Sequence, residues 1–482
     1  MMWLVVIAIV LALVYWYGMC NYSLVSHLQG PEPYPFIGNI PDIIKNGTLH
    51  KTIHKFYKRY GRVYKFCIGR TPTIIVNDPE IARQILVKQS DKFPDRPLFV
   101  KSAPPMDKNM FVVRGATWKR IRTILTPTFS SSKLKQLVPI IESSSNILSD
   151  IIEKHASKGK SVDCYRLFAI FALDVIMKSA FGYETDVQSN PDDELIRRGR
   201  EVFKIPLWKR AFSMFPFADR ISTLLKLNAV QNTDYFLRMA LDMIHSRQVK
   251  GTTGRRDLLQ LMLEAHDSTV NGASKLSDEE LAVQATVFLI AGFETTGNTL
   301  SYTAYYLATH PDIQDRLLEE LDKAHDNRGD TSLYDFCLSH EYLDRVLCEV
   351  LRLCPPAFMH LRHCDQDCVI EGIHFPKGVD VSVAAWNLHR DPEAWEYPEE
   401  FYPDHFTPEA KLKRHAFSYE PFSMGPRQCI GMRFALTELK ICLVTILKKF
   451  KLERAPDTAP LDLEGALLLQ PTQPIMLRIR KR

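Results

Sequence analysis

The sequence lacks a strong excess of charge of either sign, since 61 lysines and arginines stand against 56 aspartates and glutamates. A net charge of +5 over 482 residues is too small to predict a nucleic-acid-binding protein. Hydrophobic residues make up 46% of the chain, as in an ordinary folded protein. Any signal for a ligand or partner must therefore come from local motifs.

The chain also lacks a dense cysteine framework, because its 10 cysteines are scattered over its whole length. This excludes a disulfide-stapled scaffold and predicts mostly reduced thiols in a reducing compartment. Cys364 and Cys368 lie close to His360 and His363, which allows a zinc site as one interpretation. Their spacing matches no established zinc pattern, and a strand-rich turn is the interpretation we favour.

The first 20 residues, MMWLVVIAIVLALVYWYGMC, lack any charged side chain. This length suffices for a helix to cross a bilayer, and Trp16 has the place of an interfacial aromatic residue. A cleaved signal peptide would show a basic start and a small-residue cleavage site, and a mitochondrial transit peptide would be rich in arginine. We therefore expect residues 1–20 to be a retained transmembrane anchor.

Two features follow this anchor. Residues 21–39 are expected to form a proline-rich linker, because GPEPYPFIGN places three prolines between Gly30 and Asn39. No comparable linker follows, so residues 40–482 are expected to form a single domain. Basic side chains then place this domain on the cytosolic side by the positive-inside rule. They outnumber the acidic Asp42 and are Lys45, Lys51, Lys55, Lys58, Arg59, Arg62 and Lys65.

Helical periodicity covers most of this domain and predicts a mainly α fold with small β-sheets. Strand-like runs cluster in RVYKFCIG with TPTIIVND near the front, and in CVIEGIHFPKGVDVSVAAW behind the middle. The predicted helices are Ser132–His155, Asp163–Phe181, Asn232–Arg247, Ser277–His310, Pro311–His325 and Tyr342–Leu353.

The longest predicted helix, Ser277–His310, begins with Ser277 as its N-cap and Glu280 three residues on. It contains AGFETTG, from Ala291 to Gly297. Gly292 costs about 1 kcal/mol relative to alanine inside a helix, so its missing side chain needs a reason. A polar notch for dioxygen or water, next to Glu294 and Thr295, is one reason. Close packing of a neighbouring helix against the glycine is the other, and both remain open here.

Two further motifs lie towards the end of the chain. EVLR places Glu349 and Arg352 one turn apart on an otherwise apolar helix, which predicts a structural ion pair. FSMGPRQCIG, from Phe422 to Gly431, places Cys429 in a glycine-containing loop just before an amphipathic helix. The positive end of a helix favours a thiolate, so Cys429 is a candidate metal ligand.

These motifs, in this order and spacing, resemble the haem-thiolate monooxygenases, the cytochromes P450. The resemblance covers nearly the whole chain and includes the EEFYPDHF stretch that ends at Phe406. It implies the cytochrome P450 fold, in which haem b lies between the long core helix and the cysteine loop. Cys429 would then be the axial iron ligand, and residues 40–482 the catalytic domain.

The resemblance also assigns residues around the haem. Phe422 would lie against the ligand sulfur and limit water, while Gly425 and Gly431 would let the backbone approach the flat macrocycle. Hydrogen bonds to the two propionates would come from four arginines and a tryptophan, since the planar guanidinium matches a carboxylate. These residues are Arg96, Trp118, Arg122, Arg362 and Arg427.

One position departs from the family pattern. EEFYPDHF usually carries an arginine that completes a network with Glu349 and Arg352, and this chain has His405 there. Because histidine offers fewer donors, we expect the network to be weaker or rebuilt around water.

Several stretches are more specifically similar to the membrane-bound animal group that includes drug-metabolising enzymes and thromboxane synthase. The resemblance implies a monooxygenase of the endoplasmic reticulum membrane that inserts one oxygen atom into a lipophilic substrate. Glu294 and Thr295 would relay protons. A peroxide isomerase of the thromboxane-synthase kind is an alternative, but such members tend to lose this pair. A non-catalytic haem sensor is a second alternative, and it would not need the pair.

Electrons would come from an NADPH-dependent flavoprotein reductase, with cytochrome b5 as a further candidate donor. The chain contains no GxGxxG fingerprint, so the reductase must be a separate protein. A basic docking surface for it is expected on Lys119, Arg120, Arg433, Lys440, Lys448 and Lys449. The apolar segment Ile205–Phe217 is expected to dip into the membrane beside a substrate entrance. Candidate pocket walls are Phe99, Met106, Phe111, Phe288, Phe358 and Met359.

Overall fold

The computed structural model describes residues 2–97, 104–190, 193–202, 224, 232–250, 257–267, 275–326, 329, 331–465 and 468–482. Helices dominate. The longer ones are α1 (Met2–Met19), α3 (Leu49–Tyr60), α5 (Gly115–Leu125), α7 (Val138–Ala156), α8 (Cys164–Ile176), α12 (Thr233–Lys250), α13 (Leu258–Asp267), α14 (Asp278–Thr309), α15 (Pro311–Asp326), α17 (Glu341–Leu353) and α20 (Met432–Leu447).

The shorter helices connect and flank these elements. They are α2 (Ile40–Asn46), α4 (Pro79–Arg83), α6 (Ser131–Lys135), α9 (Glu194–Glu201), α16 (Leu333–Ser339), α18 (Ala385–Leu388) and α19 (Pro408–Lys413). Short 3-10 or π turns are η1 (Cys20–Val25), η2 (Gln84–Lys88), η3 (Met106–Lys108), η4 (Thr126–Phe129), η5 (Met177–Phe181), η6 (Pro403–Phe406) and η7 (Ala416–Ser418).

The strands form small sheets, and the largest has the order β1-β2-β7-β4. Its strands are β1 (Val63–Ile68), β2 (Thr71–Val76), β7 (Asp380–Val383) and β4 (His360–His363). The pairs β1/β2 and β4/β7 are antiparallel, whereas β2 and β7 run parallel with Thr73 opposite Asp380. The two regions predicted to hold strands thus supply β1, β2 and β7 of this sheet and the hairpin of β5 (Cys368–Ile370) with β6 (Ile373–Phe375), whereas β4 lies outside both.

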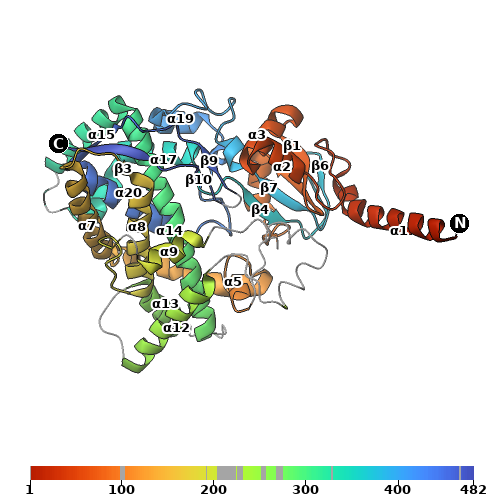
Figure 1. Cartoon of the computed structure of the whole chain (residues 1–482), viewed down its shortest axis with the longest axis horizontal. Helices are drawn as coiled ribbons and strands as arrows, with labels where there is room; N and C mark the ends of the chain where they lie inside the picture. Colours follow the sequence, from red (N-terminus) through yellow and green to blue (C-terminus); the bar gives the residue numbers. More distant parts are fainter. Residues whose placement is uncertain are drawn as a thin grey trace.

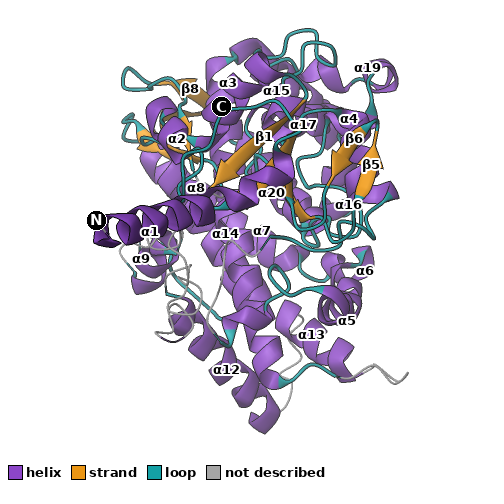
Figure 2. Ribbon diagram, turned by 90° about the vertical axis from the view of Figure 1, so that its right-hand side faces the viewer, coloured by secondary structure: helices purple, strands orange, loops and turns teal. Residues whose placement is uncertain are grey.

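A second sheet was not predicted. It pairs β3 (Val162–Asp163) and β8 (Phe450–Arg454) with β11 (Met476–Lys481) between them, and β9 (Leu463–Glu464) pairs with β10 (Gln470–Pro471). In Figure 2 the strands gather in the upper half of the view, and helices such as α12 and α13 build the lower part.

Helix α14 passes through the core and confirms the longest predicted helix. The backbone N–H of Glu280 donates to the Ser277 hydroxyl at 3.1 Å, and the Ser277 N–H donates back to the Glu280 carboxylate at 2.9 Å. This is the predicted capping box. A Cβ on Gly297 would lie 3.0 Å from the Cα of Ala169, so α14 and α8 cross in close contact.

One predicted helix is wrong in its continuity. The segment Ser132–His155 divides into α6 and α7, which begins at Val138 with a proline in its first turn. Pro139 has no N–H to donate and its ring is compatible only with a helix start, so the chain turns at Gln136 and Leu137 before the helix resumes.

Helix α1 extends away from the body at the N-terminal end (Figure 1). Within the described residues one helical stretch, Met2–Val25, is long and apolar enough to cross a membrane. The following segment packs onto the largest sheet, because the Tyr22 hydroxyl donates to the Gly69 carbonyl at 2.8 Å and Val25 is fully buried.

Candidate functional site

Cys429 lies in the loop that leads into α20. The Cys429 N–H donates to the Phe422 carbonyl at 3.0 Å, which closes the loop. Its thiol is exposed, unlike the nine other cysteines, and accepts hydrogen bonds from the backbone amides of Gly431 and Met432. Surrounding protein raises the pKa of this thiol, while the two amides and nearby arginines oppose that rise. A metal ion would add the positive charge that holds the thiolate.

The two glycines of this loop, Gly425 and Gly431, are explained by different features of the structure. Gly425 has φ = 77°, and a Cβ there would lie 1.9 Å from the Leu86 carbonyl oxygen. Its close approach is to the backbone of η2, which explains this glycine without reference to a macrocycle. A Cβ on Gly431 would meet no protein atom within 4 Å, so a flat group can approach the backbone at that position.

Four arginines from separate elements converge near Cys429. Burial, and then repulsion from Arg362 and Arg427, lower the pKa of Arg96 to about 9, while the Cys429 thiolate opposes this shift. Arg122 on α5 is also held near Cys429, although burial lowers its pKa. Burial lowers the pKa of both Arg362 and Arg427 to about 10. Guanidiniums that repel one another in this way require negative charge.

The described residues supply little of that charge. Asp95 pairs with Arg427, whose guanidinium also donates to the Pro94 carbonyl at 2.9 Å. Glu420 lies near Arg362, but burial raises its pKa well above the usual value, and neither carboxyl oxygen has a hydrogen-bond partner. The chemistry of this donor set therefore fits a group with two carboxylates, such as the propionates of haem.

The aromatic residues of the site stand beside this cluster. The Arg427 guanidinium lies 3.9 Å from the centre of the Trp118 ring, and Trp118 shares a face of α5 with Arg122, one turn on. Phe422 is half-buried at the start of the cysteine loop. The structure thus brings together all seven residues assigned to the cofactor and its iron.

Glu294 and Thr295 lie near the middle of α14 but point to different partners. Glu294 is 5% exposed and accepts hydrogen bonds from the Tyr165 hydroxyl at 2.9 Å and the Gln470 amide at 2.7 Å. The Thr295 hydroxyl donates to the Ala291 carbonyl at 2.7 Å. Ala291 is exposed although most of its helix is buried, so this turn faces an open region.

Gly292 belongs to helix packing. A Cβ at this position would lie 2.8 Å from Cδ1 of Ile176 on α8, which explains the missing side chain. The small polar notch is therefore not required by Gly292.

Sequence reasoning missed the partners of the site residues. Tyr165 and Gln470 hold Glu294 from positions 129 and 176 residues away, and no local pattern indicates either contact. Asp95, next to Arg96 in FPDRP, pairs with Arg427, 332 residues along the chain, so its place beside Arg96 does not indicate its true partner.

The fully buried Glu349 and Arg352 form a two-bond ion pair at 2.7 and 2.8 Å. His405 is 5% exposed, and its Nδ1 lies 3.1 Å from the Glu349 carboxylate. The network is therefore closed by a direct histidine contact.

Some residues predicted for the docking surface or the pocket wall are paired or buried. Lys440 is buried and paired with Asp344, and Arg120 pairs with Glu280, so these two are not free docking charges. Phe358 is fully buried in the core and is not a pocket wall. Phe99 and Ile205–Phe217 lie outside the described residues.

The remaining wall candidates differ in exposure. Met106 and Phe288 are buried, Met359 is half-buried, and Phe111 is exposed beneath the Arg96 guanidinium.

The zinc interpretation fails on geometry. The Cys364 thiol donates to the Gln366 carbonyl, His363 contacts Asp380, and His360 contacts the Glu420 carbonyl. Within the part of the chain that the structure describes, no three His, Cys, Asp or Glu side chains are grouped to hold a metal ion.

Comparison with known proteins gives one family. The family model described as Cytochrome P450 matches residues 28–479. Cytochrome P450 3A16 of Mus musculus is 36% identical over 490 residues, which cover 99% of this chain and 96% of that protein. Lithocholate 6-beta-hydroxylase of Mesocricetus auratus is 36% identical and Cytochrome P450 3A29 of Sus scrofa 37% identical, each with the same coverage. These relatives favour neither the isomerase nor the sensor, and the chain belongs to the cytochrome P450 family of haem-thiolate monooxygenases.

Proposed function

We propose that this chain holds haem b through the Cys429 thiolate and oxidises a lipophilic small molecule with one atom of dioxygen. The supporting observation is the exposed Cys429 thiol, which accepts hydrogen bonds from two backbone amides. Four arginines lie beside it, and the single carboxylate of Asp95 leaves most of their positive charge uncompensated. When bound, the haem supplies the oxygen-activating and redox chemistry.

The protein's own residues position that cofactor. The Gly431 and Met432 amides stabilise negative charge on the Cys429 sulfur, and Phe422 limits the access of water to it. Arg96, Trp118, Arg122, Arg362 and Arg427 are proposed to donate hydrogen bonds to the propionates. Neutralisation by two carboxylates would relieve the repulsion among the four guanidiniums.

Proton delivery is proposed for Glu294 and Thr295. The Glu294 carboxyl is buried and held in place by Tyr165 and Gln470, so it can store a proton at a fixed position. The Thr295 hydroxyl donates to the Ala291 carbonyl in its own helix, which leaves its oxygen able to accept a hydrogen bond. A relay through this hydroxyl would release its own proton as the oxygen accepts another from the Glu294 carboxyl.

The electron donor is proposed to be a separate NADPH-dependent flavoprotein reductase, with cytochrome b5 as a second donor. The exposed predicted residues Lys119, Arg433, Lys448 and Lys449 remain candidates for its docking surface. With α1 in the endoplasmic reticulum membrane, residues 21–39 would join the anchor to a catalytic domain, residues 40–482, that faces the cytosol.

Cys429→Ser tests the ligand assignment. We expect the reduced carbon monoxide complex of this variant to lose the red-shifted band of a thiolate-ligated haem, and turnover to fall below detection. The half-buried Cys348 gives a matched control, because Cys348→Ser should keep both. A thiolate band that survives in Cys429→Ser would overturn the assignment.

Turnover is measured with NADPH, the reductase and lithocholate, the compound in the name of the hamster relative. Oxidised product that requires NADPH supports the monooxygenase. A normal thiolate band without turnover of lithocholate or of a panel of steroids and fatty acids would contradict it.

A further inference from the structure

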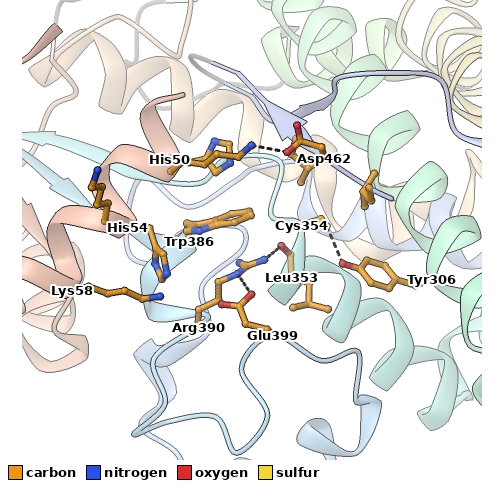
Figure 3. Close-up of a pocket in the computed structure, with 14 residues that line it drawn as sticks. His50, His54, Lys58, Tyr306, Leu353, Cys354, Trp386, Arg390, Glu399 and Asp462 are labelled. Atoms are coloured by element: carbon orange, nitrogen blue, oxygen red, sulfur yellow. Dashed lines mark hydrogen bonds and ion pairs between the residues drawn. The ribbon is translucent and has the colours of Figure 1, made fainter. Parts of the chain in front are cut away.

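A cavity of about 540 Å³ lies between α3, α18 and the segment Leu461–Leu463 (Figure 3). Tyr306 lines it from the C-terminal part of α14. Because Tyr306 follows Thr295 by three helical turns, about 16 Å along the axis, the cavity is separate from the site built around Cys429. The described function leaves it without a role.

Two residues that line this cavity each carry a buried polar atom for which the described parts of the chain supply no hydrogen-bond partner. Arg390 is 7% exposed; its Nε contacts Glu399 at 3.2 Å and its Nη2 donates to the Leu353 carbonyl, but Nη1 has no hydrogen-bond partner. His50 is 1% exposed, and its Nδ1 likewise has none. Buried polar groups in proteins are almost always satisfied. The Arg390 N–H therefore indicates a ligand with an acceptor atom, and so does His50 in the tautomer that carries its proton on Nδ1.

The rim of the cavity carries an excess of positive charge. Lys51 pairs with Asp462 at 2.6 Å, and Arg390 pairs with Glu399. Lys55 donates to the Asn46 side chain, and Lys58 lines the rim; in the described parts of the chain neither forms an ion pair with a carboxylate. Asp462 and Glu399 are thus already paired, and the positive charges of Lys55 and Lys58 favour the binding of an anion.

The interior offers an apolar, planar surface. The Arg390 guanidinium stacks 3.5 Å from the centre of the Trp386 ring, and the His50 ring meets the same indole edge-on at 4.7 Å. Figure 3 shows these rings between α3, which carries His54 and Lys58, and the opposite wall at Tyr306 and Cys354. Stacking fixes the plane of the guanidinium and therefore the direction of its free N–H.

We propose that this cavity binds a small organic anion with an oxyanion head and an apolar body. The head accepts from Arg390 Nη1 and from His50 Nδ1 in the tautomer that carries its proton there, and Lys58 attracts it at the rim. The apolar body lies against Trp386 and Leu463. A volume of this size is typical of sites for small molecules.

The test is isothermal titration calorimetry of the purified holoprotein at low ionic strength, where charge contacts are least screened. Phenyl phosphate serves as the anion with an apolar body, and inorganic phosphate as the anion without one. The variants are Lys58→Gln and, as a matched control, Arg59→Gln. Arg59 is the next residue of α3, is exposed, and does not line the cavity.

We expect phenyl phosphate to bind with 1:1 stoichiometry and more tightly than inorganic phosphate. Lys58→Gln should raise its dissociation constant three- to tenfold, roughly the effect of one partly exposed charge, and Arg59→Gln should change it less than twofold. The haem absorption band should not shift, because the ligand does not reach the iron. Arg390→Lys, which keeps the charge but loses the planar fork, should weaken binding more than Lys58→Gln.

Four results would overturn the proposal. Phenyl phosphate without measurable binding at millimolar concentration would mean that water alone satisfies the buried donors. Equal losses in Lys58→Gln and Arg59→Gln would indicate general charge attraction. A shifted haem band would place the ligand at the iron. Equal affinity for the two phosphates would show that the apolar body of the ligand contributes nothing to binding.

Discussion

Glu349→Gln tests how much the buried ion pair contributes to stability. Glu349 Oε1 accepts from Arg352 Nη2 at 2.7 Å and from the Tyr402 N–H at 2.9 Å, and Oε2 accepts from Arg352 Nε at 2.8 Å. Both side chains are fully buried. Removing one partner of such a pair leaves an uncompensated buried charge, which costs about 3–5 kcal/mol.

The structure favours the lower end of this range. The Arg352 guanidinium keeps bonds to the carbonyls of His389 at 2.8 Å, Pro398 at 2.6 Å and Glu400 at 2.8 Å. These acceptors still solvate the charge after the carboxylate is gone. We therefore expect a loss of about 3 kcal/mol in the free energy of unfolding.

A haem protein of this size is expected to unfold irreversibly, so the assay is the half-life of the haem absorption band at a fixed elevated temperature. A loss of about 3 kcal/mol corresponds to decay up to about 140-fold faster. Glu341→Gln is the matched control on the same helix, because its pair with Arg345 is exposed on the Glu341 side and should change the half-life less than about twofold. Equal half-lives for the two variants would refute the reasoning.

The remaining predictions concern pH and two glycines. Burial raises the pKa of Glu420, so the folded state loses up to about 1.4 kcal/mol of stability for each pH unit above about 4.5. Glu420→Gln should therefore lengthen the half-life of the haem band more at pH 7 than at pH 5. An equal effect at both pH values would contradict this. Gly425→Ala should abolish haem incorporation, because its Cβ would lie 1.9 Å from the Leu86 carbonyl. Gly292→Ala should keep the thiolate band, since the Ile176 side chain it meets can move; loss of the band would restore a functional role for this glycine.

The sequence predicted the elements whose signals are local. The capping box at Ser277 and the apolar run behind it suffice to place α14, and Pro311 marks the start of α15. The break between α6 and α7 was also visible in principle, because Pro139 is compatible only with the first turn of a helix. That signal was outweighed by a periodicity that continues on both sides of it.

Elements joined over long distances could not be predicted in the same way. Strand β3 has two residues, and it exists because Leu477 and Met476, near the other end of the chain, pair with Val162 and Asp163. No alternation can be read from two residues. The pair of the buried Lys440 with the partly exposed Asp344 was missed for a related reason, since a lysine on an amphipathic helix is expected to be solvated unless its distant partner is known.

The cysteine side of the site was more predictable than the α14 side. Cys429, its arginine and the following helix are contiguous, so their chemistry can be inferred from one motif. Glu294 depends on Tyr165 and Gln470, which approach from α8 and β10, and these contacts exist only in the folded chain.

His405 shows how the network compensates for its missing arginine. An ionised carboxylate only accepts hydrogen bonds, so His405 Nδ1 carries the proton and donates to Glu349. With two bonds from Arg352 and one from the Tyr402 amide, the carboxylate receives four donors and needs no second guanidinium.

The missing hydrogen bond of this network is on His405. Among the described residues none pairs with the buried His405 Nε2, and the ring packs edge-on against Trp395 at 5.3 Å. An unsatisfied buried nitrogen costs about 1–3 kcal/mol. The backbone of His405 is better served, because the Arg414 guanidinium donates to its carbonyl at 3.1 Å and lies 3.8 Å from the centre of the same Trp395 ring. Histidine at position 405 thus leaves Glu349 fully paired and costs one hydrogen bond, at its own Nε2.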